Sequence, residues 1–530
     1  MPKRLIFLAA LLAGACTTTD RREPAFSPET RDIAQLGAAM ASGATSSEAM
    51  TLAYLARIAA LDDAGPMLNA VIATMPDALD QARRLDAERR AGRVRGPMHG
   101  VPVLVKDNIE VAGPLPTTAG SLALANNVTN RDAPLVARLR AAGAVILGKT
   151  NLSEWANIRS NESTSGWSAV GGLVRNPHAL DRNACGSSSG SGAAMAAGLA
   201  AATIGTETDG SIMCPAGTNG VVGFKPTLGL VSRTHIVPIS HSQDTAGPMT
   251  GSVMDAAIML SAIAGSDPAD AATAEADSRK RDYTADLSPD WLRGKRIGVL
   301  RDRLGDRPET LAIVEAAAVA LKTAGVIVVD IAESRKGLDG LGDDEFEVLM
   351  TELKADMGAY LRSLPDTASE GGGPRSLADL IAFNMANAGQ ELRWFDQDLF
   401  ELGESKGGLD SKAYRDALAK SKRLAGPEGI DRLLATHKVD LLMGVTNGPA
   451  WVTDLVNGDN FTGPGSSQLP AIAGYPHLTV PGATIEGLPV GISFFGAKWK
   501  DADVLAAGYA FERVWKPRPV PGYRASVAPE

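Results

Sequence analysis

The sequence predicts an α/β protein, a single large domain in which a mixed central β-sheet is flanked by helices on both faces. The chain has 530 residues, of which 45% are hydrophobic, and this is enough to bury one large core. Its 56 glycines and its alanine-rich stretches are typical of tight turns and of helices packed closely on a sheet. Short apolar runs alternate along the chain with longer amphipathic segments, which is the pattern of strands and covering helices.

The charge distribution argues against nucleic acid as a partner. The chain carries 52 basic and 61 acidic residues, a formal net charge of −9 at pH 7, and it has no long basic run. Only 5% of the residues are aromatic. A nucleic-acid-binding surface needs clustered positive charge, so we expect no such partner.

The first 16 residues have the features of a bacterial export signal. Two basic residues precede an apolar run over 5–15, and small residues lead to Cys16. The run is too short to cross a bilayer as a helix, which takes roughly 20 apolar residues. The sequence before Cys16 resembles a lipoprotein cleavage box. We therefore expect an exported protein that is periplasmic or anchored to the membrane by a lipid on Cys16, with 17–26 as a tether, or that is otherwise secreted.

The rest of the chain, residues 27–530, is expected to form the one domain, and it begins with a predicted helical layer over 27–92. Three amphipathic segments carry apolar residues at helical spacing, and serine or threonine residues ahead of two of them can cap the first turn. These helices are expected at about 33–40, 50–60 and 75–90.

Strands and helices alternate in the predicted core, residues 93–333. A run of β-branched and apolar residues predicts a buried strand at 101–105. Further along the core, the same patterns predict helices at 133–142, 191–202 and 311–324 and strands at 144–147, 296–300 and 326–329.

No strand pattern occurs over 334–437, and the polar, helical character of this stretch predicts a cap over one end of the sheet. Strand patterns return at 441–443 and 488–494, so residues 438–530 are expected to complete the core. Aromatic residues of the cap and beyond are expected to help line the entrance to the site. They are Phe383, Trp394, Phe395, Phe400 and Phe461.

Two familiar motifs occur in surroundings that do not suit them. Residues 143–150 match the P-loop pattern, but the apolar residues between its glycines form a predicted strand and leave no flexible loop for phosphate. Gly186-Ser-Ser-Ser-Gly190 matches the nucleophile elbow of α/β-hydrolases, with Ser188 at its centre. A polar loop precedes it where the elbow needs a strand, so neither motif is favoured.

Metal chemistry is not indicated either. The six histidines form no His-x-x-x-His pair and no cluster with acidic residues at the spacing of metal ligands. We expect these histidines at core or surface positions, and we expect neither a metal nor a cofactor.

The strongest indication of chemistry is the block 185–216, which is rich in serine and glycine. Two Ser-Gly turns bracket an Ala/Gly helix, and the turn Thr208-Asp-Gly-Ser211 can direct consecutive backbone N–H groups at one point, as an oxyanion requires. Lys106 directly follows an apolar strand, where desolvation lowers a lysine pKa so that the amine can accept a proton. Alone, the turns could merely pack a helix and Lys106 could merely end a strand, so the interpretation depends on their combination.

The segment Gly96-Pro-Met-His-Gly-Val-Pro-Val-Leu-Val-Lys106-Asp-Asn, taken with this block, resembles the amidase signature family over nearly the whole of 27–530. The resemblance implies a Ser-cis-Ser-Lys catalytic unit with Ser211 as the nucleophile and Lys106 as the base. Ser187 would be the bridging serine, after a cis Gly186–Ser187 peptide bond. The oxyanion hole would consist of the backbone N–H groups of Thr208, Asp209, Gly210 and Ser211.

Within that family, the form Thr206-Glu-Thr-Asp-Gly-Ser-Ile212 looks like the peptide amidase branch, whereas many members have glycine in place of Asp209. This implies hydrolysis of the C-terminal amides of peptides with release of ammonia, by a monomer or weak oligomer. The alternatives are amidases of other small amides (aryl acylamides, fatty acyl amides or cyclic oligomeric amides), a catalytically silent binding protein on the same scaffold, and a glutamine-dependent amidotransferase subunit. The export signal argues against the last of these.

Two cysteines flank the two serines of the implied catalytic unit. Cys185 lies two residues before Ser187, and Cys214 lies three residues after Ser211. They could pair in an oxidising compartment. The interpretation that we favour is that both are small buried packing residues.

Overall fold

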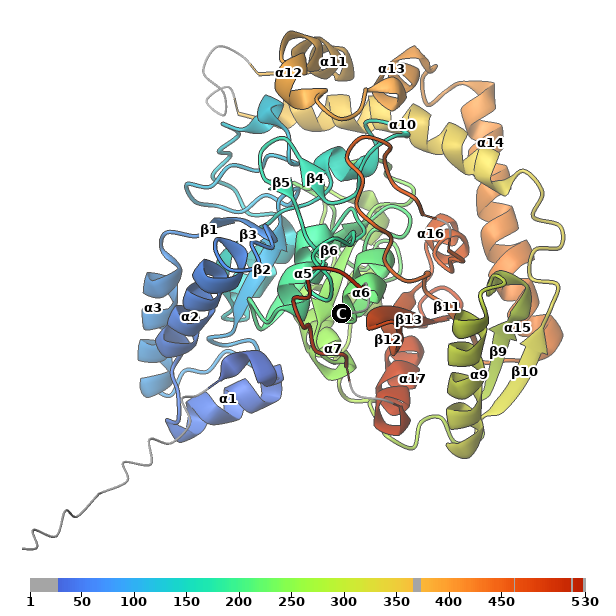
Figure 1. Ribbon diagram of the computed structural model, residues 1–530, viewed down its shortest axis with the longest axis horizontal. Coiled ribbons are helices and arrows are strands. Elements are labelled where there is room, and N and C mark those ends of the chain that lie inside the picture. The colour runs from blue at the N-terminus through green and yellow to red at the C-terminus, as the bar shows by residue number, and fades with distance from the viewer. Residues whose placement is uncertain (1–26, 366–372, 462, 516–517, 528–530) are drawn as a thin grey trace, which may run out of the picture.

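The computed structural model describes residues 27–365, 373–461, 463–515 and 518–527. Within these residues, eleven strands form one mixed sheet through the middle of the protein (Figure 1). The predicted export signal and tether lie outside these ranges. In spatial order the strands are β1 (Val71–Thr74), β3 (Val145–Thr150), β2 (Pro102–Lys106), β6 (Ala202–Glu207), β8 (Thr245–Thr250), β7 (Val222–Lys225), β12 (His477–Ile485), β13 (Leu488–Phe495), β11 (Leu441–Val445), β9 (Arg296–Leu300) and β10 (Ile327–Ile331).

Helices surround this sheet. In chain order they are α1 (Ile33–Ser42), α2 (Ser47–Arg57), α3 (Ala78–Arg90), α4 (Pro134–Ala141), α5 (Ser189–Ala196), α6 (Met213–Asn219), α7 (Val253–Ile263), α8 (Ala276–Arg279), α9 (Pro308–Thr323), α10 (Leu341–Ser363), α11 (Leu377–Ala386), α12 (Ala388–Glu391), α13 (Asp398–Ser405), α14 (Lys412–Ala425), α15 (Arg432–His437), α16 (Gln468–Ala473) and α17 (Asp501–Val514). None of them, in the part of the chain that the structure describes, is both long and apolar enough to cross a membrane.

The sheet is mixed, and its two faces are covered by different helices. β2 runs parallel to β3 and β6, and β9 runs parallel to β10 and β11, whereas the strands between these groups pair antiparallel. Leu478 of β12 lies against Gly508 of α17. The next residue of the strand, Thr479, points to the same face of the sheet as the one that Ala216 of α6 covers. Neighbouring residues of a strand point to opposite faces, so α6 and α17 cover opposite faces, as the sequence predicts.

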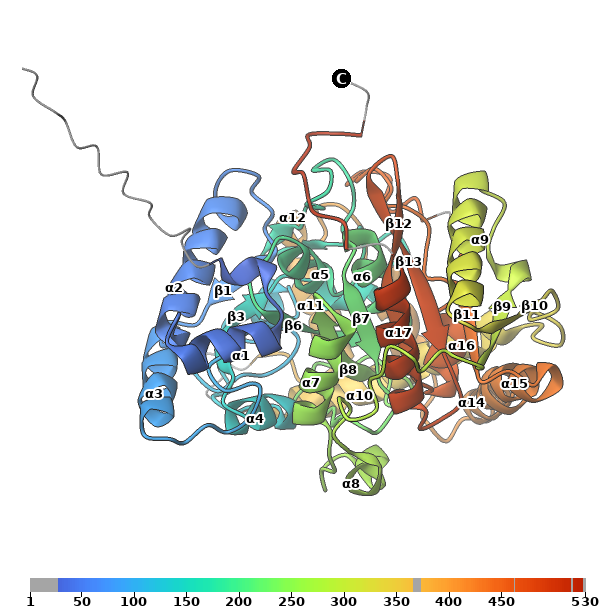
Figure 2. The ribbon, with the colours of Figure 1, turned by 90° about the horizontal axis from the view of Figure 1, so that it is seen from below.

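Helices predominate in the two stretches that were predicted as an N-terminal layer and a cap. Helices α1 to α3 stand at one edge of the sheet (Figures 1 and 2), and the short strand β1 between them is an element that the sequence pattern did not predict. Helices α10 to α14 arch over one end of the sheet (Figure 1), and the described residues between 334 and 437 contain no strand. A separate apolar cluster, which includes residues of α10, α11 and α13, holds the cap together.

One helix ends earlier than expected. The alanine-rich pattern predicts a helix over 191–202, but α5 ends at Ala196 and Ala202 already begins β6. Gly198 adopts a φ of +65°, a left-handed conformation that terminates helices and that glycine adopts without strain. The early end lets β6 enter the sheet beside β2, which carries Lys106.

Candidate active site

Lys106, the last residue of β2, is fully buried and donates hydrogen bonds to two side chains. Its Nζ atom lies 2.8 Å from Ser187 Oγ and 2.8 Å from Thr206 Oγ1. Burial lowers the pKa of Lys106 to about 7, although the carboxylates of Asp244 and Glu207 oppose this shift. At neutral pH a large fraction of the amine is therefore uncharged and can accept the proton of Ser187.

Ser187 follows a cis Gly186–Ser187 peptide bond, as the resemblance implies. Gly186 has no room for a side chain, because a Cβ atom there would lie 2.1 Å from Ser153 Oγ. The next residue, Ser188, donates its backbone N–H to the Ser211 carbonyl oxygen at 3.2 Å. The two serine-containing segments, 24 positions apart in the chain, thus lie side by side.

The nucleophile-elbow and P-loop patterns, which the sequence did not favour, are accounted for in other ways. Ser188 is fully buried, and its hydroxyl both donates to the Thr206 carbonyl oxygen and accepts from the Thr206 N–H. The Ser188 hydroxyl group therefore links the start of α5 to β6. It is buried, whereas the serine of a nucleophile elbow must be exposed. The last six residues of the P-loop match, Val145–Thr150, form the strand β3 and not a loop.

The turn over 208–211 connects β6 to α6. Gly210 adopts a φ of +78°, and the Glu207 carboxylate accepts hydrogen bonds from the N–H groups of Ile212 and Met213 at the start of α6. Among the described residues we find no acceptor for the N–H groups of Asp209, Gly210 and Ser211. These donors are therefore free to bind an oxyanion.

A cavity of about 430 Å³ opens beside Ser187. Its inner end is formed by Ser187 together with Asn108 and Thr206, and Asn108 Nδ2 donates to Thr206 Oγ1 at 2.9 Å. Residues 233–239 form one wall, and Asp356 and Tyr360 of α10 form part of another. The cap helix α10 therefore contributes directly to the site.

Comparison with known proteins identifies the family. The family model described as Amidase matches residues 49–505. The chain belongs to the amidase family. It is an amide hydrolase by the same comparison, and the predicted family and enzyme class are confirmed.

Individual relatives agree with this assignment. The solved structure of native peptide amidase from Stenotrophomonas maltophilia is 51% identical, covers 93% of this chain and 98% of its own, and has a TM-score of 0.88. A probable amidase of Arabidopsis thaliana is 38% identical over 98% of this chain and 97% of its own length. A glutamyl-tRNA(Gln) amidotransferase subunit of Moorella thermoacetica is 35% identical over 88% of this chain and 93% of its own.

The two cysteines of this amidase form a disulfide bond. The sulfur atoms of Cys185 and Cys214 are 1.98 Å apart, so the interpretation of both residues as separate packing residues is wrong. Because the segments that contain Ser187 and Ser211 lie side by side, the Cα atoms of the two cysteines come within 5.9 Å of each other, a distance that a disulfide spans readily.

In the turn over 208–211 of the amidase, Asp209 is paired with a second buried carboxyl group, that of Glu345, and no sequence pattern indicated this pair. Asp209 interacts with the carboxyl group of Glu345, near the start of α10, and its Oδ1 atom is buried without a hydrogen-bond partner among the described residues. Burial, together with the negative charge of Glu345, raises the pKa of Asp209 to about 7. Gln243 and Gln468 each donate a hydrogen bond to Glu345, at 2.9 and 3.0 Å. Burial raises the pKa of Glu345 as well, so both carboxyl groups keep their protons to a higher pH than exposed acids do.

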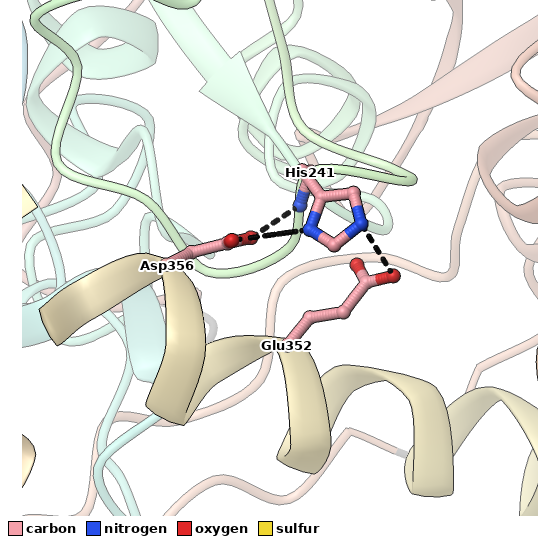
Figure 3. Close-up of side chains that lie close together, drawn as sticks. All are labelled: His241, Glu352 and Asp356. Atoms are coloured by element: carbon pink, nitrogen blue, oxygen red, sulfur yellow. Dashed lines mark hydrogen bonds and ion pairs between the residues drawn. The ribbon is translucent and has the colours of Figure 1, made fainter. Parts of the chain in front are cut away.

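At the outer end of the cavity, His241 lies between two carboxylates of α10 (Figure 3). Its Nδ1 atom is 2.9 Å from Asp356 and its Nε2 atom is 3.3 Å from Glu352. Hydrogen bonding to Asp356 raises the pKa of His241. Each carboxylate faces a different ring nitrogen, so the contacts are those of an imidazolium between two acids. This cluster was not predicted from the sequence, because more than a hundred positions separate His241 from Glu352.

None of the five aromatic residues expected at the entrance is among the described residues that line the cavity beside Ser187. Phe400 is fully buried and packs edge-on against Trp155 at 5.7 Å between ring centroids, inside the apolar cluster of the cap. Phe461 lies against Trp451 and lines a different cavity. The aromatic residue that does line the cavity beside Ser187 is Tyr360.

Proposed function

We propose that this amidase hydrolyses the C-terminal amides of peptides and releases ammonia, with Ser211 as nucleophile, Ser187 as the bridging serine and Lys106 as base. The contact between Lys106 Nζ and Ser187 Oγ, at 2.8 Å, is the observation that carries the proposal. The 51% identity to a peptide amidase supports the choice of substrate.

The reaction would begin with proton transfer. Neutral Lys106 takes the proton of Ser187, Ser187 takes that of Ser211, and Ser211 Oγ attacks the amide carbonyl carbon. The free N–H groups of residues 209–211 stabilise the negative charge that develops on the carbonyl oxygen. The N–H group of Thr208 is the fourth donor of the proposed oxyanion hole. The same proton relay then protonates the amide nitrogen, the C–N bond breaks, and ammonia leaves. Water hydrolyses the acyl-enzyme and restores Ser211.

A second candidate function, that of a component of a glutamine-dependent amidotransferase, has the similarity to the Moorella protein in its favour. Two features oppose it. The N-terminal sequence has the pattern of an export signal, whereas aminoacyl-tRNA is cytoplasmic. A disulfide beside the site is also unusual in a cytoplasmic protein.

We extend the proposal to the location of the protein. The pattern of the first 16 residues and the Cys185–Cys214 disulfide both support export to an oxidising compartment, with Cys16 as the residue that carries a lipid if the protein is anchored. A labelled fatty acid fed to producing cells would be incorporated into wild type and not into a Cys16→Ala variant. Incorporation into neither protein would favour plain secretion.

The proposed activity is tested by ammonia release from a panel of amidated peptides, glutamine and an aryl acylamide, with wild type and Ser211→Ala protein in parallel. Serine-dependent release from the amidated peptides is the expected result. Release from glutamine alone would favour the amidotransferase assignment, and activity of the Ser211→Ala variant equal to wild type would overturn the assignment of the nucleophile.

A further inference from the structure

The imidazole ring of His241 is fixed at one nitrogen, and its other nitrogen faces a carboxylate (Figure 3). The backbone N–H group of His241 donates to Asp356 at 2.7 Å, and Nδ1 lies 2.9 Å from the same carboxylate. Asp356 therefore sets the orientation of the ring, and in the neutral ring it favours the tautomer with the proton on Nδ1. In that tautomer Nε2, which faces Glu352, carries the lone pair.

The carboxylate of Glu352 is also held in place. Glu352 is a fully buried residue of α10. Its Oε2 atom accepts hydrogen bonds from Ser240 Oγ and from the backbone N–H group of Ser242, and its Oε1 atom accepts one from the Tyr414 hydroxyl at 2.7 Å. Oε1 is also the atom that faces His241. These three donors are neutral groups, so they orient the carboxylate without balancing its charge.

The separation between Nε2 of His241 and Oε1 of Glu352 is longer than a strong hydrogen bond. The two atoms are 3.3 Å apart, whereas a charge-assisted N–H···O contact is normally about 2.7–2.9 Å. Zinc binds histidine nitrogen and carboxylate oxygen at about 2.0–2.2 Å, so two such ligands in a tetrahedral arrangement lie about 3.3–3.5 Å apart. The observed separation is therefore that of two ligands of one metal ion.

We propose that His241 and Glu352 bind a divalent transition-metal ion, such as Zn²⁺, between Nε2 and Oε1, and that Asp356 orients the histidine from the other side. Histidines that bind metals commonly donate their second N–H group to a carboxylate, which is the relation of Nδ1 to Asp356. The three side chains present ligand atoms within 4.8 Å of one another. Imidazole as a ligand selects Zn²⁺ and its neighbours over Mg²⁺ and Ca²⁺. His241 is 44% exposed, so water can reach the ion and complete its coordination.

The charges of the cluster also favour a divalent cation. No lysine or arginine in the part of the chain that the structure describes forms an ion pair with Glu352 or Asp356. Lys422 of α14 donates instead to the backbone carbonyl oxygens of Ser242 and Ile472, both at 2.6 Å. A protonated imidazole ring balances only one of the two carboxylates. When a divalent ion takes the place of the Nε2 proton, two positive charges face two negative ones.

The bound ion joins two parts of the fold at the outer end of the cavity. His241 and Asp356 line the cavity, and His241 follows the wall over 233–239, whereas Glu352 belongs to the cap helix α10. The ion thus attaches the cap to this wall, and it stabilises the folded protein because it binds the assembled site only. None of the three residues belongs to the proposed proton relay, so the inference is independent of the proposed substrate.

Binding is tested with the full-length protein after its metal has been removed with a chelator. Zn²⁺ is titrated in a calorimeter, and Co²⁺ is titrated in parallel because its visible absorption reports nitrogen and oxygen ligands. We expect one equivalent of Zn²⁺ to bind, and we expect Co²⁺ to produce absorption bands that Zn²⁺ abolishes. Binding of neither ion would overturn the inference.

Four variants locate the site. His241→Gln and Glu352→Gln each remove a ligand and should lose both signals. Asp356→Asn keeps the two ligands and changes only the group that orients the ring, so the affinity for Zn²⁺ should fall about 10- to 100-fold. His437→Gln is the matched control, because His437 contacts one carboxylate, that of Glu333 at 2.7 Å, and it should bind Zn²⁺ as wild type does. Binding that persists unchanged in both His241→Gln and Glu352→Gln would be adventitious and would overturn the inference.

Thermal unfolding separates the loss of a ligand from the loss of the fold. Excess Zn²⁺ should raise the unfolding midpoint of wild type and of His437→Gln by a few degrees, and the chelator should reverse the shift. The metal-free midpoints show which variants are folded. His241 is partly exposed, so His241→Gln remains decisive even where the buried Glu352→Gln substitution prevents folding. A folded His241→Gln protein whose midpoint rises with Zn²⁺ as much as that of wild type would contradict the site.

Discussion

A disulfide bond joins Cys185, two residues before Ser187, to Cys214, three residues after Ser211. The bond ties the segment that carries the bridging serine to the first turn of α6, which follows the proposed nucleophile. Together with the hydrogen bond from Ser188 N to Ser211 O, it fixes the distance between the two loops that carry the proposed proton relay.

Removal of the disulfide should destabilise the fold and lower activity. The two cysteines are 29 positions apart, and a loop of this size corresponds to about 3 to 4 kcal/mol in the chain-entropy account of disulfide stability. Denaturant unfolding of wild type with and without reductant should show this loss. The Cys185→Ala/Cys214→Ala protein is the control, and reductant should not destabilise it further. Quantitative thiol labelling of unreduced, unfolded wild type at both positions would contradict the account.

The activity should rise with pH through the region in which Lys106 loses its proton. The base must be neutral to act, and burial lowers the pKa of Lys106 to about 7, so kcat/KM should increase between about pH 6 and pH 8. Lys106→Ala should lower kcat by about 100-fold or more.

Lys106→Arg is the informative companion variant. Arginine keeps the positive charge and cannot become neutral in this pH range, so it should be as inactive as the alanine variant. A pH profile that is flat from 5.5 to 8.5, or substantial activity in Lys106→Arg, would show that Lys106 is not the base.

The acid pair Asp209 and Glu345 should limit activity at alkaline pH. Loss of the Asp209 proton places a negative charge on the turn whose N–H groups are proposed to bind the oxyanion, and this opposes the charge that develops in the transition state. Asp209→Asn removes that ionisation while it keeps a similar shape. Since the pKa of Asp209 is about 7, the ratio of kcat/KM at pH 8.5 to that at pH 6 should be higher in the variant than in wild type. Equal ratios would mean that the pair does not act on the oxyanion.

A buried ion-pair network anchors the cap to the core, and its loss should be costly. Arg159 is fully buried and donates hydrogen bonds to Glu154 and to the backbone carbonyl of Glu391, at the end of α12, while its guanidinium stacks on Phe395 at 4.2 Å. Arg159→Met leaves two buried carboxylates without their partner and should destabilise the protein by about 3 to 5 kcal/mol.

The comparison for this prediction is an exposed pair. Arg293 and Asp290 are 3.0 Å apart and each about 75% exposed, so Arg293→Met should change the free energy of unfolding by less than about 1 kcal/mol. Equal unfolding midpoints for Arg159→Met and Arg293→Met in urea would contradict the role given to Arg159.

The parts of the fold that the sequence predicted are those whose local pattern matches their final environment. The buried strand that ends at Lys106 and the helices of the cap have such patterns. By contrast, β8 contains Gly247 and Pro248 and occupies the middle of the sheet, where proline is ordinarily absent. Its strand character comes from pairing with β6 and β7 and not from its own residues, so no local pattern could reveal it.

The site shows the same division. Lys106, Ser187 and Ser211 were predicted as the catalytic unit because they lie in motifs with fixed spacing. The structure places Lys106 against Ser187 and the Ser187 segment against the Ser211 segment. The disulfide and the contact of Asp209 with Glu345 depend on which distant segments meet after folding. The serines beside the two cysteines showed only that the cysteines could pair, and the residues around Asp209 and Glu345 gave no indication of their contact.

The central claim, that Ser211 is the nucleophile, is tested most directly by trapping the covalent intermediate. Wild-type protein would be treated with a fluorophosphonate, digested and examined by mass spectrometry, with Ser211→Ala protein treated in the same way. We predict a single adduct on Ser211 in wild type, formed faster as the pH rises through about 7, and none in the variant. An adduct on Ser188 or Ser187, or equal labelling of the Ser211→Ala protein, would contradict the account.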